Sequence, residues 1–133
     1  MRKRADIVAK PGGGKSALHR AVVAAVKAAY PQMTVTEEAT IEGRTGKLYV
    51  DILIRELRVC IECHGRQHFE YVPHFHGSRE AFDRAARRDA EKARAIADAG
   101  HVLVVVPHTD EGKLTPDHIG RLVLAALRDR SSS

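Results

Sequence analysis

The feature that most constrains the fold is a pair of β-forming segments, residues 48–54 and 58–64, that only a few residues separate. So short a connection favours an antiparallel hairpin, because parallel strands need a crossover of about a dozen residues or more. If residues 56–57 form the loop, Arg55 faces Arg58 and the pairing runs outward from there. The chain is therefore expected to contain a sheet built around this hairpin.

This register assigns each side chain of the hairpin to one face of the sheet, because successive side chains of a strand alternate. One face would be entirely apolar and is expected to pack in the core; it carries Val50, Ile52, Ile54, Val59, Ile61 and Cys63. On the other face Asp51 lies opposite Glu62, and Tyr49 lies opposite His64. Opposed carboxylates destabilise a sheet by up to about 1 kcal/mol. A divalent cation between them would remove the repulsion, although a one-residue shift of register or a nearby arginine is also compatible with the sequence.

Further elements follow from hydrophobic periodicity and from capping residues. Helices are expected over residues 17–30, 77–99 and 116–127, and strands over residues 34–41 and 101–107. The resulting order αβββαβα implies a mixed sheet, because two strands joined through a helix should run parallel. We therefore expect an α/β fold with a mixed four-stranded sheet flanked by helices and an extra C-terminal helix. The 133 residues suit one compact domain, placed at residues 16–130.

The long helix expected over residues 77–99 has an acidic residue on the side that should meet the sheet. Its apolar stripe at helical spacing comprises Phe82, Ala85, Ala86, Ala93, Ile96 and Ala97, with Asp89 in the middle. A carboxylate in such a place needs a specific partner, since an unpaired buried charge is costly. His64, Arg88 and Lys92 are the available partners, and an i, i+3 pair with Lys92 agrees equally well with the spacing.

Three parts of the sequence together resemble the PD-(D/E)XK nuclease superfamily. They are Asp51, the segment CIECHGRQHF at residues 60–69, and the Arg88–Asp89 pair with Lys92. Within the superfamily, the chain is most similar to the very-short-patch-repair (Vsr-like) endonucleases and the related EDxHD homing and phage endonucleases. The similarity covers residues 48–107, a little under half of the chain, and the order of elements extends it more loosely.

The resemblance implies a role for each matched residue. Asp51 corresponds to the metal-binding carboxylate of the second strand, and Glu62 corresponds to the acid of the ExK element. His64 takes the place of the lysine of that element, as in the repair branch, where the backbone carbonyl at the position of Cys63 also binds metal. Asp89 corresponds to the helix aspartate that orients this histidine in the repair branch.

Other positions resemble the phage and homing branch or depart from the pattern. Gly65 and the Gln67–His68 pair are similar to that branch. The first helix often carries a glutamate in these families, but the closest position in this chain is His19. The missing acid could be supplied by Glu37, which shares strand parity with its apolar neighbours, or by water.

These roles imply a restriction-endonuclease-like αβββαβ core that hydrolyses phosphodiester bonds in DNA, as an endonuclease or a nickase. Mg²⁺ held by Asp51, Glu62 and the Cys63 carbonyl would activate water and neutralise the developing charge, and Mn²⁺ could substitute. His64 or His68 would move the proton. The missing helix-one acid leaves a second hypothesis open, a catalytically inactive protein of the same fold that binds DNA or a protein partner. Either protein could act as a monomer or a homodimer.

The formal net charge of +5 is unevenly distributed along the chain. Residues 1–15 hold five basic side chains and one acidic side chain, so the remainder is almost neutral. We expect a flexible basic arm that contacts phosphates, although a solubilising tail would have the same charge. The predicted DNA contacts are Arg2, Lys3, Arg4 and Lys15 in the arm, with Arg66, Gln67, Arg88 and Lys92 around the site.

Three motifs have other interpretations. Residues 9–16, AKPGGGKS, fit a loose P-loop pattern and leave a nucleotide-binding hypothesis open, although the first glycine is missing. Residues 60–64, CIECH, match the c-type haem attachment string, but residues three apart on a strand point to opposite faces. A structural zinc site is a less favoured hypothesis; its ligands would come from Cys60, Cys63, His64, His68, His74 and His76.

The sequence also bears on the compartment. No apolar run approaches the ~18–20 residues that cross a bilayer, and no hydrophobic signal core follows the basic N-terminus. With two cysteines and no export signal, disulfides are not expected to stabilise the fold. The expectation is a soluble, cytoplasmic protein without a membrane partner, located in the host-cell cytoplasm if a phage encodes it.

Overall fold

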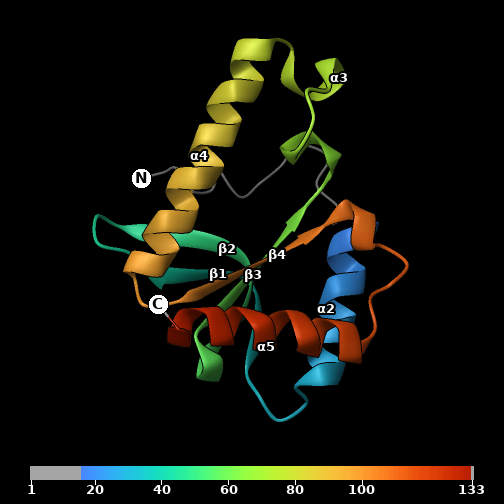
Figure 1. Cartoon of the computed structure of the whole chain (residues 1–133), viewed down its shortest axis with the longest axis vertical. Helices are drawn as coiled ribbons and strands as arrows, with labels where there is room; N and C mark the ends of the chain where they lie inside the picture. Colours follow the sequence, from blue (N-terminus) through green and yellow to red (C-terminus); the bar gives the residue numbers. More distant parts are fainter. Residues whose placement is uncertain (1–15, 133) are drawn as a thin grey trace.

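The structure is a computed structural model, and it describes residues 16–132. A four-stranded sheet forms its centre, with the strands in the order β1-β2-β3-β4. The strands are β1 (Val35–Glu42), β2 (Lys47–Ile54), β3 (Val59–His64) and β4 (Val102–Pro107). Helices cover both faces of the sheet (Figure 1). The expected α/β class with a mixed, helix-flanked sheet is confirmed, whereas the expected arm at residues 1–15 lies outside the described residues.

The hairpin between β2 and β3 has the register that the alternation of side chains predicts. The strands are antiparallel, and the paired positions are Ile52 with Ile61, Leu53 with Cys60 and Ile54 with Val59. A 3₁₀ turn at Arg55–Leu57 connects them, and Arg58 closes the turn with φ 54°. Strand β4 runs parallel to β3, as expected for strands joined through a helix. The sheet is therefore mixed, because a hairpin joins β2 to β3 and a helix joins β3 to β4.

The helices of the structure are α2 (Ala17–Ala29), α3 (Pro73–His76), α4 (Arg79–Asp98) and α5 (Pro116–Ser132). Ser16 caps α2 and Ser78 caps α4, because each hydroxyl accepts a hydrogen bond from a first-turn backbone N–H. Helix α4 therefore begins after Gly77, which has φ 80°, and not at Gly77 as expected. The short α3 was not expected, because a single turn has no periodicity to detect. Among the described helices, none combines the length and apolar character required to cross a bilayer.

Each face of the sheet has its own hydrophobic core. The larger core joins α2 and α5 to one face, where it includes Ile52, Ile54, Val59 and Ile61 of the hairpin. The smaller core joins α4 to the opposite face and consists of Ala39, Ile41, Val50, Leu53, Cys60 and Ile96. Val50 thus packs with Leu53 and not with Ile52, which corrects the expected grouping. Cys60 and Cys63 pack against different cores, as expected for residues three apart on a strand.

The alternation of faces breaks at Asp51 because both strand ladders are interrupted there. The β1–β2 pairing skips Glu38 and Asp51. Glu38 has φ 49°, and an unpaired residue of this kind bends a strand locally. The β2–β3 pairing stops one residue short of Asp51, so the expected backbone pair of Asp51 with Glu62 does not form, nor does that of Tyr49 with His64.

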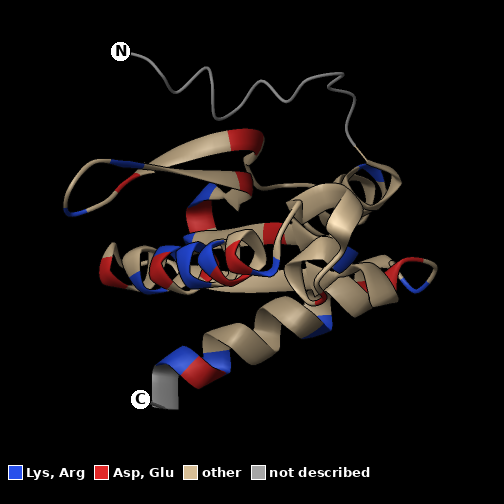
Figure 2. Ribbon diagram, turned by 90° about the horizontal axis from the view of Figure 1, so that it is seen from above, with Lys and Arg blue, Asp and Glu red and all other residues tan. Residues whose placement is uncertain are grey.

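Helix α4 lies over the sheet with its C-terminal half only, and its first half extends beyond the sheet beside α3 (Figure 1). Of the expected apolar stripe only Ile96 is fully buried, while Ala86 and Ala97 are exposed. Basic and acidic residues are interspersed along the helix (Figure 2). The buried stripe is narrower than expected because the first half of the helix has no sheet beneath it.

Candidate active site

A pocket of about 260 Å³ opens where the β1–β2 and β2–β3 ladders are interrupted. Its walls come from β1, β2, β3, the segment after β3, and α4. The lining residues are Glu38, Tyr49, Val50, Asp51, Glu62, Cys63, His64, His68, Asp89 and Lys92. The five expected catalytic residues and the three expected metal ligands therefore surround one pocket. Tyr49 also lines the pocket, on the side of the hairpin where strand parity placed it, whereas Glu38 and Val50 are not expected there. The β1–β2 register, whose interruption sets Glu38 beside Asp51, is the signal that indicates Glu38.

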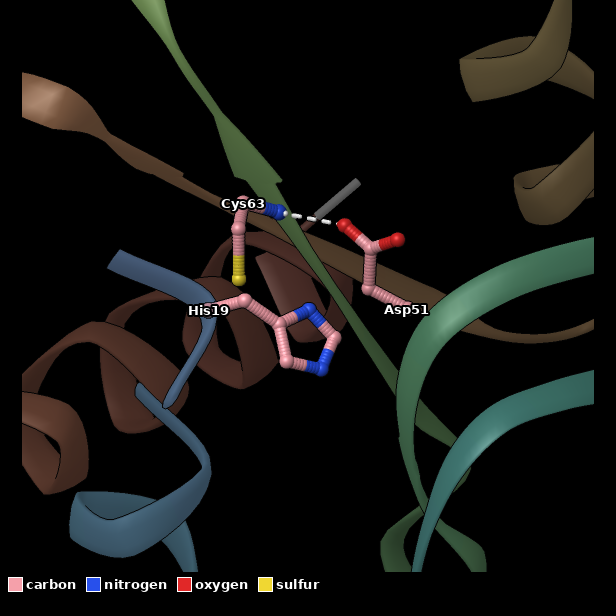
Figure 3. Close-up of side chains that lie close together, drawn as sticks. All are labelled: His19, Asp51 and Cys63. Atoms are coloured by element: carbon pink, nitrogen blue, oxygen red, sulfur yellow. Dashed lines mark hydrogen bonds between the residues drawn. The ribbon is translucent and has the colours of Figure 1, made fainter. Parts of the chain in front are cut away.

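The side chains of Asp51 and Glu62 accept hydrogen bonds from backbone N–H groups at the point where the backbone pairing of β2 with β3 has stopped. The backbone N–H of Asp51 donates to Glu62 Oε2 at 2.9 Å. The backbone N–H of Cys63 donates to Asp51 Oδ2 at 2.8 Å, the bond drawn as a dashed line in Figure 3. Each carboxylate is thus fixed by the backbone of the neighbouring strand, and both line the pocket at the point where the strands separate.

Lys92 on α4 pairs with Glu62 and does not form the suggested i, i+3 pair with Asp89. Its Nζ lies 2.9 Å from Glu62 Oε1. Glu62 is buried, and this burial together with the nearby Asp51 raises the pKa of its carboxyl group. The charge of Lys92 and its hydrogen bond act in the opposite direction. Lys92 therefore lines the site as the partner of Glu62, whereas the sequence suggested a contact with DNA or a pair with Asp89.

The partner of Asp89 is His68, which corrects the expectation that Asp89 orients His64. His68 Nδ1 lies 2.8 Å from Asp89 Oδ2. The 3₁₀ turn at Arg66–His68 brings this imidazole back over the pocket to α4. His64 instead stacks on His68, with ring centroids 3.9 Å apart and an interplanar angle of 13°. Burial and the neighbouring His68 lower the pKa of His64, so this imidazole favours its neutral form.

His19 brings the first helix to the Asp51 end of the site. Ligand atoms of His19, Asp51 and Cys63 all lie within 4.8 Å of one another. Figure 3 shows the His19 imidazole beside both the Cys63 sulfur and the Asp51 carboxylate. His19 is 8% exposed, and its Nε2 lies 3.4 Å from Glu37 Oε1 without a hydrogen bond. The two residues that the sequence suggested in place of the helix-one acid therefore lie side by side.

The remaining residues predicted to contact DNA lie outside the pocket lining. Arg66 is exposed and forms an ion pair with Glu70 at 3.0 Å. The backbone carbonyl oxygen of Gln67 lies 3.0 Å from His76 Nε2, and Arg88 is exposed on α4. The predicted contacts Arg2, Lys3, Arg4 and Lys15 fall outside the described residues, as does most of the P-loop-like segment.

The six residues suggested for structural zinc are not brought together. Within residues 16–132, two groups of three potential metal ligands occur: His19, Asp51 and Cys63, and His64, His68 and Asp89. Neither group includes Cys60, His74 or His76. Cys60 is buried in the smaller core, and both ring nitrogens of His76 lie near backbone atoms of the segment before α4.

Comparisons with known proteins do not assign a family. No family model matches the chain, and no solved structure gives a significant match. Over 69 residues, 50% of the chain, it is 36% identical to the uncharacterized protein 307L of Invertebrate iridescent virus 6. Over 77 residues, 56% of the chain, it is 35% identical to the uncharacterized protein 094L of Frog virus 3 (isolate Goorha). The matches cover 35% and 50% of these viral relatives, whose names state no activity.

The charges around the pocket are predominantly negative. Its lining contains the carboxylates of Glu38, Asp51, Glu62 and Asp89 but only one ammonium group, that of Lys92. Carboxylates in close proximity disfavour one another's ionised form, and a divalent cation would relieve this repulsion. The pocket can therefore hold a cation on oxygen ligands beside an imidazole that a carboxylate orients.

Proposed function

We propose that the chain is a metal-dependent DNA endonuclease or nickase of the PD-(D/E)XK kind, similar to the very-short-patch-repair enzymes. The observation that carries the proposal is the interruption of the β2–β3 ladder at Asp51 and Glu62, beside the His68–Asp89 pair. The order α2-β1-β2-β3-α4-β4 supports a restriction-endonuclease-like core with α5 as the extra helix. The viral origin of the two relatives is compatible with a location in a host cell.

The donor atoms of the site fit a hard divalent cation. Mg²⁺ takes oxygen ligands, usually one or two carboxylates and several waters. Asp51 and Glu62 would provide the carboxylates, and the backbone carbonyl of Cys63 would provide a third oxygen. Burial and, after it, the nearby Asp51 raise the pKa of Glu62, and a cation would offset the repulsion from Asp51. Mn²⁺ would substitute because it accepts the same ligands.

The residues of the chain divide the chemistry between them. When bound, Mg²⁺ supplies an activated water and offsets the charge that develops on the phosphate oxygens. His68 is placed to transfer a proton, because Asp89 holds its Nδ1 and leaves Nε2 for the reacting group. Lys92 fixes Glu62 through its contact at 2.9 Å. Arg66, Arg88 and the basic residues before position 16 would contact phosphates, which position DNA without reading its sequence.

The proposal is tested by nicking of supercoiled plasmid in Mg²⁺. Asp51→Asn and Glu62→Gln should each reduce cleavage to background while retaining the fold and most DNA affinity. Glu42→Gln, which alters an exposed acid of β1 outside the pocket, is the matched control and should cleave like the wild type. Full cleavage by either site variant would contradict the assignment.

The same assay bears on the oligomeric state. Since a single site cuts one strand, double-strand cleavage would indicate a homodimer.

Two observations favour the alternative, an inactive nuclease-fold protein that binds DNA or a protein partner. Lys92 already neutralises part of the charge of Glu62, and a histidine replaces the helix-one acid. Calorimetric titration with Mg²⁺ and Mn²⁺ separates the two functions. Metal binding that Asp51→Asn abolishes supports the enzyme, whereas DNA binding without metal binding and without nicking supports the alternative.

A further inference from the structure

We propose that His19, Asp51 and the thiol sulfur of Cys63 form a binding site for a borderline-soft transition-metal ion of the Zn²⁺ class. Their ligand atoms lie within 4.8 Å of one another. One imidazole, one carboxylate and one sulfur are a typical three-residue protein set for Zn²⁺, which leaves a further position for water or substrate. This inference rests on the proposed function for what the ion does in catalysis, but metal binding by these side chains does not depend on cleavage.

The sulfur distinguishes this site from the oxygen site described above. Mg²⁺ selects oxygen ligands, whereas a thiolate and an imidazole select softer ions such as Zn²⁺ and Co²⁺. The fold turns the Cys63 side chain toward α2, and Figure 3 shows its sulfur directed to the side on which His19 lies. The backbone N–H of Cys63 meanwhile binds the Asp51 carboxylate at 2.8 Å, which holds two of the three ligand groups together.

The environment of His19 provides a second and independent observation. Its imidazole is nine-tenths buried, and Nε2 makes no hydrogen bond. Nε2 faces the Glu37 carboxylate, whose Oε1 lies 3.4 Å away. Figure 3 shows the other ring nitrogen, Nδ1, on the side of Cys63 and Asp51, so Nδ1 is the nitrogen that an ion would use. A carboxylate behind a histidine is the arrangement that orients metal-binding imidazoles, so Glu37 is the positioning residue of the site.

The three residues also lie on three different elements, α2, β2 and β3. Helix α2 and the two strands pack in the larger core, so the ligands are held by rigid elements and not by a loop. Such preorganisation is what a metal site requires. An ion bound here would also tie the first helix to the hairpin, at the point where the β2–β3 ladder is interrupted.

Titration of the metal-free full chain with Co²⁺ tests the site, because a cobalt–thiolate bond gives a charge-transfer band in the near ultraviolet. The wild type should show this band, and Zn²⁺ should displace the ion and remove it. Cys63→Ser should abolish the band, and Cys60→Ala, which alters the cysteine in the opposite core, should retain it. His19→Gln and Glu37→Gln should each weaken Co²⁺ binding, the second by about 10- to 100-fold.

The cobalt–thiolate band distinguishes this site from the neighbouring group of metal ligands and from the proposed nuclease activity. The His64–His68–Asp89 group contains no sulfur, so His68→Ala should leave the band unchanged. A wild-type chain without the band, or a band that survives in Cys63→Ser, would overturn the inference. If Cys63→Ser does not fold by circular dichroism, protection of Cys63 from maleimide by Zn²⁺ in the wild type decides instead. A cobalt band without plasmid nicking would contradict the proposed nuclease alone, and Mg²⁺-dependent nicking without the band would contradict this inference alone.

Discussion

His68 is the imidazole that the described structure places best for proton transfer. Its Nδ1 is held by Asp89 at 2.8 Å, and both side chains remain about one-third exposed, so the ring can meet a substrate. His64 lies beneath it as a stacked ring and is more buried. A carboxylate behind an imidazole fixes its tautomer and orients its ring. Under the proposed function, the division of roles is therefore a proton-transferring His68, an orienting Asp89 and a supporting His64.

A double-mutant cycle tests this division. His68→Ala should lower Mg²⁺-dependent nicking by about 10²- to 10⁴-fold, the usual contribution of a general acid or base. Asp89→Asn should lower it by about 10- to 100-fold. In the double variant the two effects should not add, because Asp89 acts through His68. The ¹⁵N signals of His68 should also shift in Asp89→Asn, which a merely structural aspartate would not cause.

The chain provides a matched control for this cycle in a second histidine–carboxylate pair. His118 Nε2 lies 2.9 Å from Asp110 Oδ2, away from the pocket lining. His118→Ala should leave nicking unchanged even if it lowers stability. Additive losses for His68 and Asp89, or an equal loss in His118→Ala, would show that the His68–Asp89 pair has no special role.

At this scale the sequence identifies the residue types of the site better than their partners. Asp51 and Glu62 could be predicted as neighbours because the expected register sets them opposite each other, although side-chain hydrogen bonds join them where the strand pairing stops. The partner of Asp89 could not, because it depends on how the segment after β3 folds into a 3₁₀ turn. Lys92 likewise meets Glu62 only because of where α4 lies over the sheet.

Among the elements, the β2–β3 hairpin forms the site because its backbone pairing stops before the ends of the two strands. Pairing of β2 with β3 follows the expected register from the turn as far as Ile52, and then the strands separate. On the opposite edge of β2, pairing with β1 is interrupted at Glu38, which adopts φ 49°. The interruption lies beside Asp51 on both sides. Side-chain carboxylates then take the backbone hydrogen bonds that a regular ladder would use.

Substitutions at Glu38 test whether this backbone conformation is an essential feature of the hairpin. The left-handed conformation is unfavourable by about 1–2 kcal/mol for residues other than glycine, and β-branched residues tolerate it least. Glu38→Gly should therefore unfold at a higher urea concentration than Glu38→Ile, by a free-energy difference of at least about 1 kcal/mol. At Glu42, a regular exposed position of the same strand, the order should reverse because strands favour isoleucine over glycine.

The same order of stability at both positions would mean that residue 38 has an ordinary strand conformation in solution.

The register of the hairpin follows from the sequence because one residue of slip would place a whole apolar set in water. The interruption of the pairing could not be predicted from the sequence. Position 38 is a glutamate, whereas a positive φ is usually marked by glycine or asparagine.

In the whole molecule, the two faces of the sheet have different tasks. The larger core, with α2 and α5, provides most of the buried apolar residues. The smaller core holds α4, and Ile96 is the fully buried residue that this helix contributes. On the same helix, Asp89 lies about two turns before Ile96 and Lys92 lies about one turn before it. The geometry of the site therefore depends on the smaller core, while the stability of the chain depends chiefly on the larger one.

Two truncations of equal size distinguish these tasks. Ile96→Ala and Ile119→Ala each remove the same atoms from a fully buried position, in the smaller and the larger core respectively, and each should lower the free energy of unfolding by about 2–5 kcal/mol. Only Ile96→Ala should increase hydrogen exchange throughout α4 at temperatures well below unfolding, since local opening follows the loss of local packing. Nicking should fall in parallel with that exchange, because an open α4 separates Asp89 from His68 and Lys92 from Glu62. Equal exchange in α4 for both variants would instead mean that the helix and the larger core open together as one unit, and that the smaller core has no separate influence on the site.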